Sequence, residues 1–163
     1  HPKKVFDKLK EDYDEFLSSI STRMDEEMVD MMGKFVVQNY NIGLDKLKDE
    51  VRKAKTVWIS NASTDFLERL EDAFREDAEI KVALFPNEKR IKNDNIQFKE
   101  AMVKIVCIVK GKEVPSISVI LNEERFFTAL KDPMSDKYVV SEMLYDECNS
   151  CFREWQKLNW THE

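Results

Sequence analysis

Two cysteines near the end of the chain have a spacing that can support chemistry. Cys148 and Cys151 are separated by two residues in the segment YDECNSCFREW, residues 145–155. A C-x-x-C pair can be a redox couple or half of a zinc site. The same helical spacing continues at Leu144, Trp155 and Leu158. Both thiols therefore lie on the apolar face of a predicted helix, where packing, a metal shared across a dimer and redox sensing are the three alternatives.

Small polar residues at the expected ends of strands form a second set of candidates. The segment WISNASTDF, residues 58–66, is an apolar strand followed by the start of a helix. Ligands of open α/β sheets gather at the carboxyl ends of strands, and helix N-termini offer free N–H groups to anions. For Ser63 and Thr64 the alternative role is to cap the helix. The candidate ligand-binding residues at these ends are Asn39, Asn41, Asn61, Ser63, Thr64 and Asn87.

Lys104 completes this set, because it interrupts the apolar segment MVKIVCIV, residues 102–109. It either points into a pocket or lies on the solvated side of a strand. The histidines are His1 and His162, so the chain has no internal imidazole to act as a general base, and we predict no catalytic residue. The paired carboxylates have no histidine beside them, and the sequence has no glycine-rich phosphate loop. Neither a metal nor a cofactor is expected.

The composition is that of a folded protein with a highly charged surface. Of 163 residues, 42% are hydrophobic and 36% are charged, and three glycines with four prolines leave little material for long loops. A formal charge of -6 argues against direct binding to a phosphate backbone. The longest apolar run is too short to span a bilayer, and three cysteines without a signal segment fit a reducing compartment. We expect a cytoplasmic protein without membrane contact, cut from a longer polypeptide because it begins with His1.

The first 32 residues predict a long helix. From residue 5 to residue 31, apolar residues recur at intervals of three and four, as in the seam of a coiled coil. Pro2 suits the start of this helix and Gly33 its end. The stripe packs either on the rest of the chain or on a second copy, in which case it is a linker and dimerisation helix of a homodimer. The candidate dimerisation residues are Phe6, Leu9, Tyr13, Phe16, Ile20 and Met24.

Residues 33–163 predict an α/β sandwich with a mixed sheet. Helices are expected at 44–54, 63–77 and 138–158, and residues 88–98 are expected to form a loop. Alternation of strands and helices predicts parallel strands in the first part, and short turns at 110–112 and 122–124 predict antiparallel strands afterwards. Strands are expected at 34–40, 56–60, 79–85, 102–109, 116–122 and 125–130.

Three segments, in this order, resemble the C-terminal half of the TrmB-like archaeal transcriptional regulators. They are FVVQNYNIGLDKLKDEVRKAKTVWIS (35–60), MVKIVCIVKGKEVPSISVILN (102–122) and LYDECNSCFREWQKL (144–158). The effector domain of this family is similar in fold to phospholipase D. The resemblance therefore implies a phospholipase D-like effector-binding domain at 33–163 and a helical linker that pairs two subunits. It also implies a winged helix DNA-binding domain upstream of His1 and a small-molecule effector, often a sugar.

The chain departs from these families at two points. It ends soon after the terminal helix, without the additional β-rich domain that contributes to sugar binding in some TrmB-like proteins, so another metabolite is an alternative effector. The phospholipase D motif H-x-K-x-x-x-x-D is absent, because aligning Lys104 with its lysine puts Met102 and Val109 at the histidine and aspartate positions. We expect a sensor and dimerisation fragment that contacts DNA only through the upstream domain. A diverged phosphodiesterase or nuclease and a ligand-free dimerisation module are the alternatives.

Overall fold

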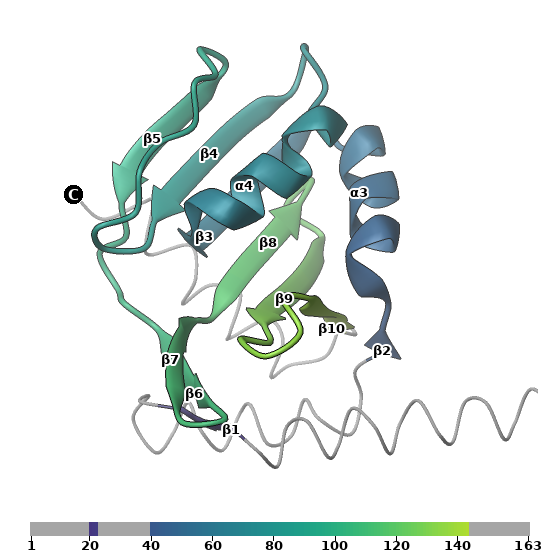
Figure 1. Cartoon of the computed structure of the whole chain (residues 1–163). Helices are drawn as coiled ribbons and strands as arrows, with labels where there is room; N and C mark the ends of the chain where they lie inside the picture. Colours follow the sequence, from purple (N-terminus) through teal and green to yellow (C-terminus); the bar gives the residue numbers. More distant parts are fainter. Residues whose placement is uncertain (1–19, 23–39, 144–163) are drawn as a thin grey trace, which may run out of the picture.

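The computed structural model describes residues 20–22 and 40–143, which form two sheets and two α-helices (Figure 1). A sheet of seven strands has the order β2-β10-β9-β8-β3-β4-β5, and a sheet of three strands has the order β1-β6-β7. The elements are β1 (Ile20–Thr22), β2 (Tyr40–Asn41), α3 (Gly43–Lys53), β3 (Thr56–Ala62), α4 (Thr64–Leu70), a 3-10 turn (Glu71–Ala73), β4 (Glu79–Leu84), β5 (Ile96–Glu100), β6 (Val106–Val109), β7 (Lys112–Pro115), β8 (Ile117–Leu121), β9 (Arg125–Lys131) and β10 (Tyr138–Met143).

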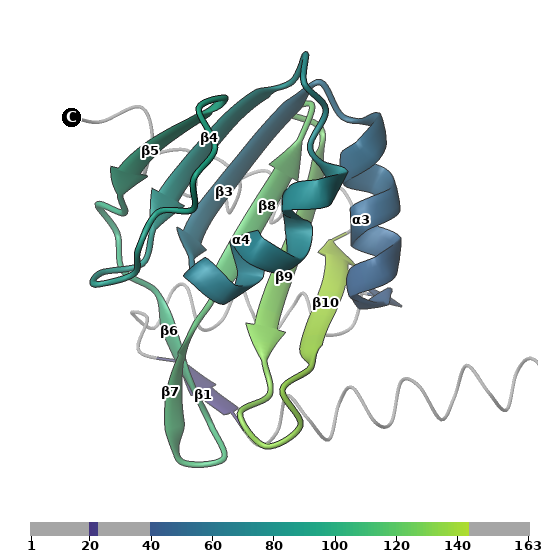
Figure 2. The ribbon, with the colours of Figure 1, turned by 45° about the horizontal axis from the view of Figure 1, so that its top comes forward.

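The seven-stranded sheet is mixed, as the sequence predicts. Strand β3 is parallel to β4, and β4 is parallel to β5, whereas β3 is antiparallel to β8. Helix α4 connects β3 to β4, so this part is the expected parallel crossover. Helices α3 and α4 lie on one face of the sheet (Figure 2). Together with alternate residues of the strands they enclose a continuous apolar core.

The helices form where the sequence gives them a buried stripe and a suitable start. In α3, Leu47 and Val51 are fully buried one turn apart. Ser63 is the N-cap of α4, and its Oγ accepts a hydrogen bond from the backbone N–H of Phe66 at 3.2 Å. This confirms capping as a role of Ser63 and fixes the direction in which α4 leaves β3.

The three-stranded sheet is built around the hairpin of β6 and β7. Lys110 and Gly111 form its turn with φ angles of 50° and 79°, and two consecutive positive φ angles are typical of a type I′ turn. Strand β1 is antiparallel to β6, with Ile20 opposite Val109. Figure 2 shows this small sheet below the end of the large one at which β3 and β4 terminate.

Several predicted elements are wrong because the pairing of strands in the tertiary structure overrides the local sequence pattern. Residues 138–143 form strand β10 instead of the start of a helix, because they pair along their full length with β9. Residues 96–98 begin the edge strand β5, whose polar pattern reads as a loop because its edge position does not demand apolar residues on both faces. Strand 102–109 begins only at Val106. Strand β2 lies beside β10 and is antiparallel to it, so it is no parallel neighbour of β3.

The helix predicted for residues 1–32 is wrong at Ile20–Thr22, because these residues pair with β6 as strand β1. The other candidate dimerisation residues, Phe6, Leu9, Tyr13, Phe16 and Met24, lie outside the described residues. Cys148 and Cys151 also lie outside them. The dimer seam and the cysteine-bearing helix therefore stay predictions.

Candidate functional site

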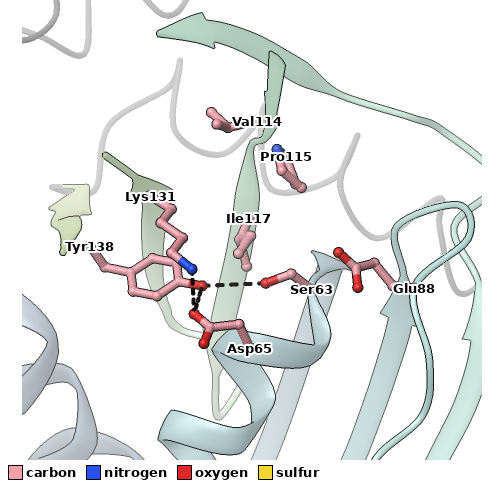
Figure 3. Close-up of a pocket in the computed structure, with 8 residues that line it drawn as sticks. All are labelled: Ser63, Asp65, Glu88, Val114, Pro115, Ile117, Lys131 and Tyr138. Atoms are coloured by element: carbon pink, nitrogen blue, oxygen red, sulfur yellow. Dashed lines mark hydrogen bonds and ion pairs between the residues drawn. The ribbon is translucent and has the colours of Figure 1, made fainter. Parts of the chain in front are cut away.

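A pocket of about 150 Å³ lies at the carboxyl end of β3 (Figure 3). The end of β3 and the start of α4 supply its floor, β9 and β10 supply one side, and the loop after β4 supplies the other. Strand β7 of the small sheet supplies an apolar wall. The pocket is lined by Ser63, Asp65, Glu88, Val114, Pro115, Ile117, Lys131 and Tyr138.

A chain of hydrogen bonds orders the polar side of the pocket. The Tyr138 hydroxyl donates to Asp65 Oδ2 at 2.8 Å, and Lys131 Nζ donates to the same oxygen at 3.1 Å. Ser63 Oγ lies 3.3 Å from the Tyr138 oxygen. Because the single Tyr138 proton is used on Asp65, the Ser63 hydroxyl donates to Tyr138. The network joins α4 to β9 and β10 through one carboxylate.

A second layer of charges holds this carboxylate in place. Arg69, one turn later on α4, approaches Asp65 Oδ2 at 3.1 Å. Asp136, in the loop between β9 and β10, pairs with Arg69 at 2.9 Å and with Lys131 at 2.8 Å. The Tyr138 ring also meets the Phe66 ring edge-on, with centroids 5.3 Å apart. The polar wall is therefore positioned from several directions before any ligand arrives.

The network fixes the charge state of its members. Burial raises the pKa of Asp65, but hydrogen bonds from Tyr138 and Lys131 outweigh it and hold that pKa below its usual value. Hydrogen bonds to Asp136 and Asp65 raise the pKa of Lys131. Burial raises the pKa of the Tyr138 hydroxyl far above its ordinary value. At neutral pH the pocket therefore presents a carboxylate, an ammonium group and a neutral phenol.

Glu88 lies across the pocket from Lys131 (Figure 3). Its Oε2 accepts hydrogen bonds from Thr64, from the backbone N–H at 3.3 Å and from the hydroxyl at 3.1 Å. Thr64 Oγ1 also lies 2.7 Å from the backbone oxygen of Lys89, so its single proton is shared between these two acceptors, and it accepts a hydrogen bond from the Lys89 N–H at 3.0 Å. Thr64, a candidate ligand residue, thus anchors the loop that carries Glu88. The two carboxylates and one ammonium group that line the pocket disfavour an anionic ligand.

Asn61, another candidate, has a structural role. It is fully buried, with φ at 58° where β3 shifts register against β4. Its Nδ2 donates to the backbone oxygen of Val103 at 3.0 Å, and its Oδ1 accepts from the N–H of Ile105 at 3.3 Å. The side chain is used on the segment that leads into β6, and it does not line the pocket.

The remaining candidates are dispersed. The Lys104 side chain is half exposed and lies outside this pocket. Its Nζ is 3.7 Å from Glu113 Oε1 and lies over the ring of Phe85. Asn87 is exposed beside a second hollow of about 210 Å³. Asn41 lies in β2 opposite Ser141, and Asn39 is outside the described residues. Of the predicted set, only Ser63 lines the pocket of Figure 3.

Sequence reasoning missed Asp65, Glu88, Lys131 and Tyr138. Asp65 lies two residues after Ser63, in the first turn of the predicted helix, and the rule for strand ends includes it when it is extended by one helical turn. Tyr138 is the first residue of the predicted helix 138–158, and Lys131 follows directly after the predicted strand 125–130. Neither residue has a local signal, because β9 and β10 bring them to the pocket only by pairing.

Residues 20–22 and 40–143 offer little support for metal binding or for thiol chemistry. No group of three or more His, Cys, Asp or Glu side chains there could hold a metal ion. Cys107 is buried, and burial raises the pKa of its thiol to about 11, which makes it a poor nucleophile. In the same residues, no helix has both the length and the apolar character needed to cross a membrane.

Comparison with models of protein families, with curated proteins and with solved structures found no match to this chain.

Proposed function

We propose that residues 40–143 are the core of a sensor domain that binds a small uncharged metabolite in the pocket lined by Ser63, Asp65, Lys131 and Tyr138. The observation that carries the proposal is the hydrogen-bond network of Ser63, Tyr138, Asp65 and Lys131 at the carboxyl end of a parallel strand. This edge is where open α/β sheets bind ligands. These four side chains already hold one another in place, so a ligand meets them without a large reorganisation.

The size and the chemistry of the pocket favour a hydroxylated ligand. A volume of about 150 Å³ is below the roughly 300 Å³ at which pockets for drug-sized molecules begin. Donor and acceptor groups line one side and Val114, Pro115 and Ile117 the other, which suits the polar edge and the apolar face of a sugar ring or polyol. The excess of carboxylates over ammonium groups works against sugar phosphates.

Binding without catalysis is the better interpretation of these residues. The internal chain has no histidine, and the phenol and the ammonium group are held in their protonated forms by their surroundings. Neither is a ready nucleophile or general base at neutral pH. The diverged phosphodiesterase is therefore the weaker alternative.

We further propose that the sensor belongs to a transcriptional regulator of the TrmB-like kind with a phospholipase D-like fold. The mixed sheet, the parallel crossover of β3, α4 and β4, and the segments that resemble this family support this. Ligand binding would shift the population of two arrangements of a homodimer and so the spacing of its DNA-binding domains. With a formal charge of -6, this chain leaves DNA contact to another domain.

Calorimetric titration of the whole chain with glucose, maltose, trehalose, myo-inositol and glycerol tests the binding role. At least one of these neutral compounds should bind, and glucose 6-phosphate should bind more weakly than glucose. Tyr138→Phe should weaken binding about tenfold, the effect of one lost hydrogen bond of roughly 1.4 kcal/mol. Met134→Ala, at a residue that is 70% exposed, is the matched control and should leave affinity unchanged.

Two outcomes would contradict this role. Absence of binding by every neutral compound would favour a ligand-free dimerisation module. Binding that survives both Tyr138→Phe and Lys131→Ala would place the ligand elsewhere. For the regulator, the full-length protein should change its affinity for its promoter DNA when the bound compound is added, and equal DNA affinity with and without the compound would reject the sensor.

A further inference from the structure

The pocket is walled by two different sheets. Ser63, Asp65, Lys131 and Tyr138 belong to the body formed by the seven-stranded sheet and its helices, whereas Val114 and Pro115 belong to β7 of the three-stranded sheet. Figure 3 shows these two residues facing the polar group from the opposite side of the pocket. A ligand that fills the pocket therefore contacts both sheets at once.

The β6–β7 hairpin joins the larger body through a narrow base. Residue Ser116 alone separates β7 from β8, and its N–H donates to the backbone oxygen of Ile105 at 3.0 Å. Asn61 holds the incoming segment through Val103 and Ile105. The base therefore consists of two backbone segments and one buried side-chain amide, that of Asn61. This geometry permits the hairpin to tilt.

Beyond the base, the described contacts of the hairpin with the large sheet are few. Cys107, Val109 and Val114 pack with Leu130 of β9 in a small apolar cluster. At the tip, Lys110 Nζ pairs with Asp132 at 3.1 Å. Val114 of this cluster and Pro115 next to the base both line the pocket, so its occupant would add contacts where the two sheets otherwise share little. Local stability follows local contact density, and the gain would be largest here.

The hairpin also carries the only described part of the first 39 residues. Strand β1 pairs with β6 over all three of its residues, Ile20 with Val109, Ser21 with Ile108 and Thr22 with Cys107. Among the described residues β1 pairs with no other strand. The position of residues 20–22 therefore depends on the position of the hairpin.

We propose that the β6–β7 hairpin transmits occupancy of the pocket to residues 20–22. The inference rests on the proposed function, because it deepens the role of the same pocket. A ligand packed against Val114 and Pro115 holds the hairpin to the large sheet and suppresses its opening. Strand β1 becomes ordered with it, so a signal at the strand ends reaches the N-terminal segment without a conformational change in the large sheet.

A tethered group tests this without knowledge of the natural ligand. In the whole chain, Glu88→Cys is treated with a hydroxyethyl thiosulfonate, which attaches a small hydroxyethyl group inside the pocket. Glu124→Cys, in the exposed turn between β8 and β9 at the other end of the sheet, receives the same reagent as the control. Both variants keep the same native thiols, and mass spectrometry counts the attached groups. Amide hydrogen exchange is then followed in segments 20–22 and 106–114.

The group at position 88 should slow exchange in both segments about fivefold or more, the lower end of coupling between sites, and the group at position 124 should slow neither. If circular dichroism shows that Glu88→Cys does not fold, Lys131→Cys attaches the group from the opposite wall. Unchanged exchange in both segments overturns the proposal, and so does slowing at 106–114 without slowing at 20–22. If no free sugar or polyol binds while the tethered group slows both segments, the proposed ligand fails and the coupling stands.

Discussion

The two sheets of this protein are each stabilised by a different kind of interaction. The seven-stranded sheet and its helices share one apolar core that reaches from Leu47 of α3 to Val140 of β10. The three-stranded sheet contributes three described residues to a small apolar cluster with Leu130 of β9, and it depends on polar contacts, chiefly those of Asn61 and of Lys110 with Asp132. The seven-stranded sheet and its helices should unfold only globally, whereas the three-stranded sheet should open locally at a lower free-energy cost. The pocket lies at the boundary between them.

The largest effect should come from the core of the large sheet. Phe66 is fully buried in α4 and meets the Tyr138 ring, so Phe66→Ala should cost about 3 to 5 kcal/mol of unfolding free energy. Urea denaturation measures this, and Met134→Ala should stay within about 0.5 kcal/mol of the parent because its side chain is exposed. A loss at Phe66 as small as that at Met134 would contradict the assignment of the main core.

Asn61→Ala should loosen the three-stranded sheet more than the seven-stranded sheet. It removes two hydrogen bonds and places alanine at a φ of 58°, and the expected cost is about 2 kcal/mol or more. Amide exchange should speed up in segment 103–116 more than in β3 and β4. Asn61→Gly, which accepts the positive φ but also lacks the amide, should cost less in total and loosen the same segment. Equal acceleration in both sheets would show that Asn61 does not hold the hairpin in particular.

A pH effect should follow from Asp65, whose pKa is lowered in the folded state by Tyr138 and Lys131 against the effect of burial. Such a carboxylate stabilises the fold above its unfolded pKa of about 3.9, and this contribution is lost as the pH falls through the folded pKa. The difference in unfolding free energy between the parent and Asp65→Asn should therefore shrink from pH 7 to about pH 3.

The size of this effect should be below that of Asn61→Ala, because solvent screens a side chain that is 38% exposed. Phe66→Leu changes no charge and should cost the same at both pH values. If the cost of Asp65→Asn is constant over this range, the ion pairs around Asp65 do not contribute to stability.

The smallest global effect is expected at the hairpin tip. Lys110→Ala removes an ion pair whose lysine is 43% exposed, and such pairs contribute less than about 1 kcal/mol. Exchange should nevertheless speed up in the turn at 110–112 and leave β3 unchanged, and Lys110→Arg should preserve the parent rate. Acceleration that spreads to β3 would mean that hairpin and sheet open as one unit.

The elements that were predicted well are those whose periodicity agrees with their tertiary environment. Strand β3 is a continuous apolar run because it lies between β8 and β4, and α3 has a clear stripe because only one of its faces is buried. The turn at residues 122–124 was also predicted correctly, where Asn122 and Glu123 adopt positive φ. In these places local preference and the fold agree.

The errors fall where pairing between distant strands overrides local pattern. The sequence pattern predicts a helix for Tyr138 to Met143, yet β9 pairs with all six residues and makes them a strand. The polar strand β5 and the strand β1 at Ile20–Thr22, where a helix is predicted, depend in the same way on pairing with β4 and β6. The same pairings bring Lys131 and Tyr138 to the pocket, which is why the site was predicted less well than the fold.

By itself the sequence determined the α/β class, the mixed sheet, a helix N-cap at Ser63 or Thr64 and the absence of an internal histidine. These depend on composition, on periodicity and on contacts three or four residues apart, all of which can be read along the chain. Only the tertiary structure decided that Asn61 is a buried tether and that Asp65, Lys131 and Tyr138 share one network. Asp65 and Tyr138 are 73 residues apart in the chain. Such contacts leave no periodic pattern, because they are set by how the sheet orders its strands.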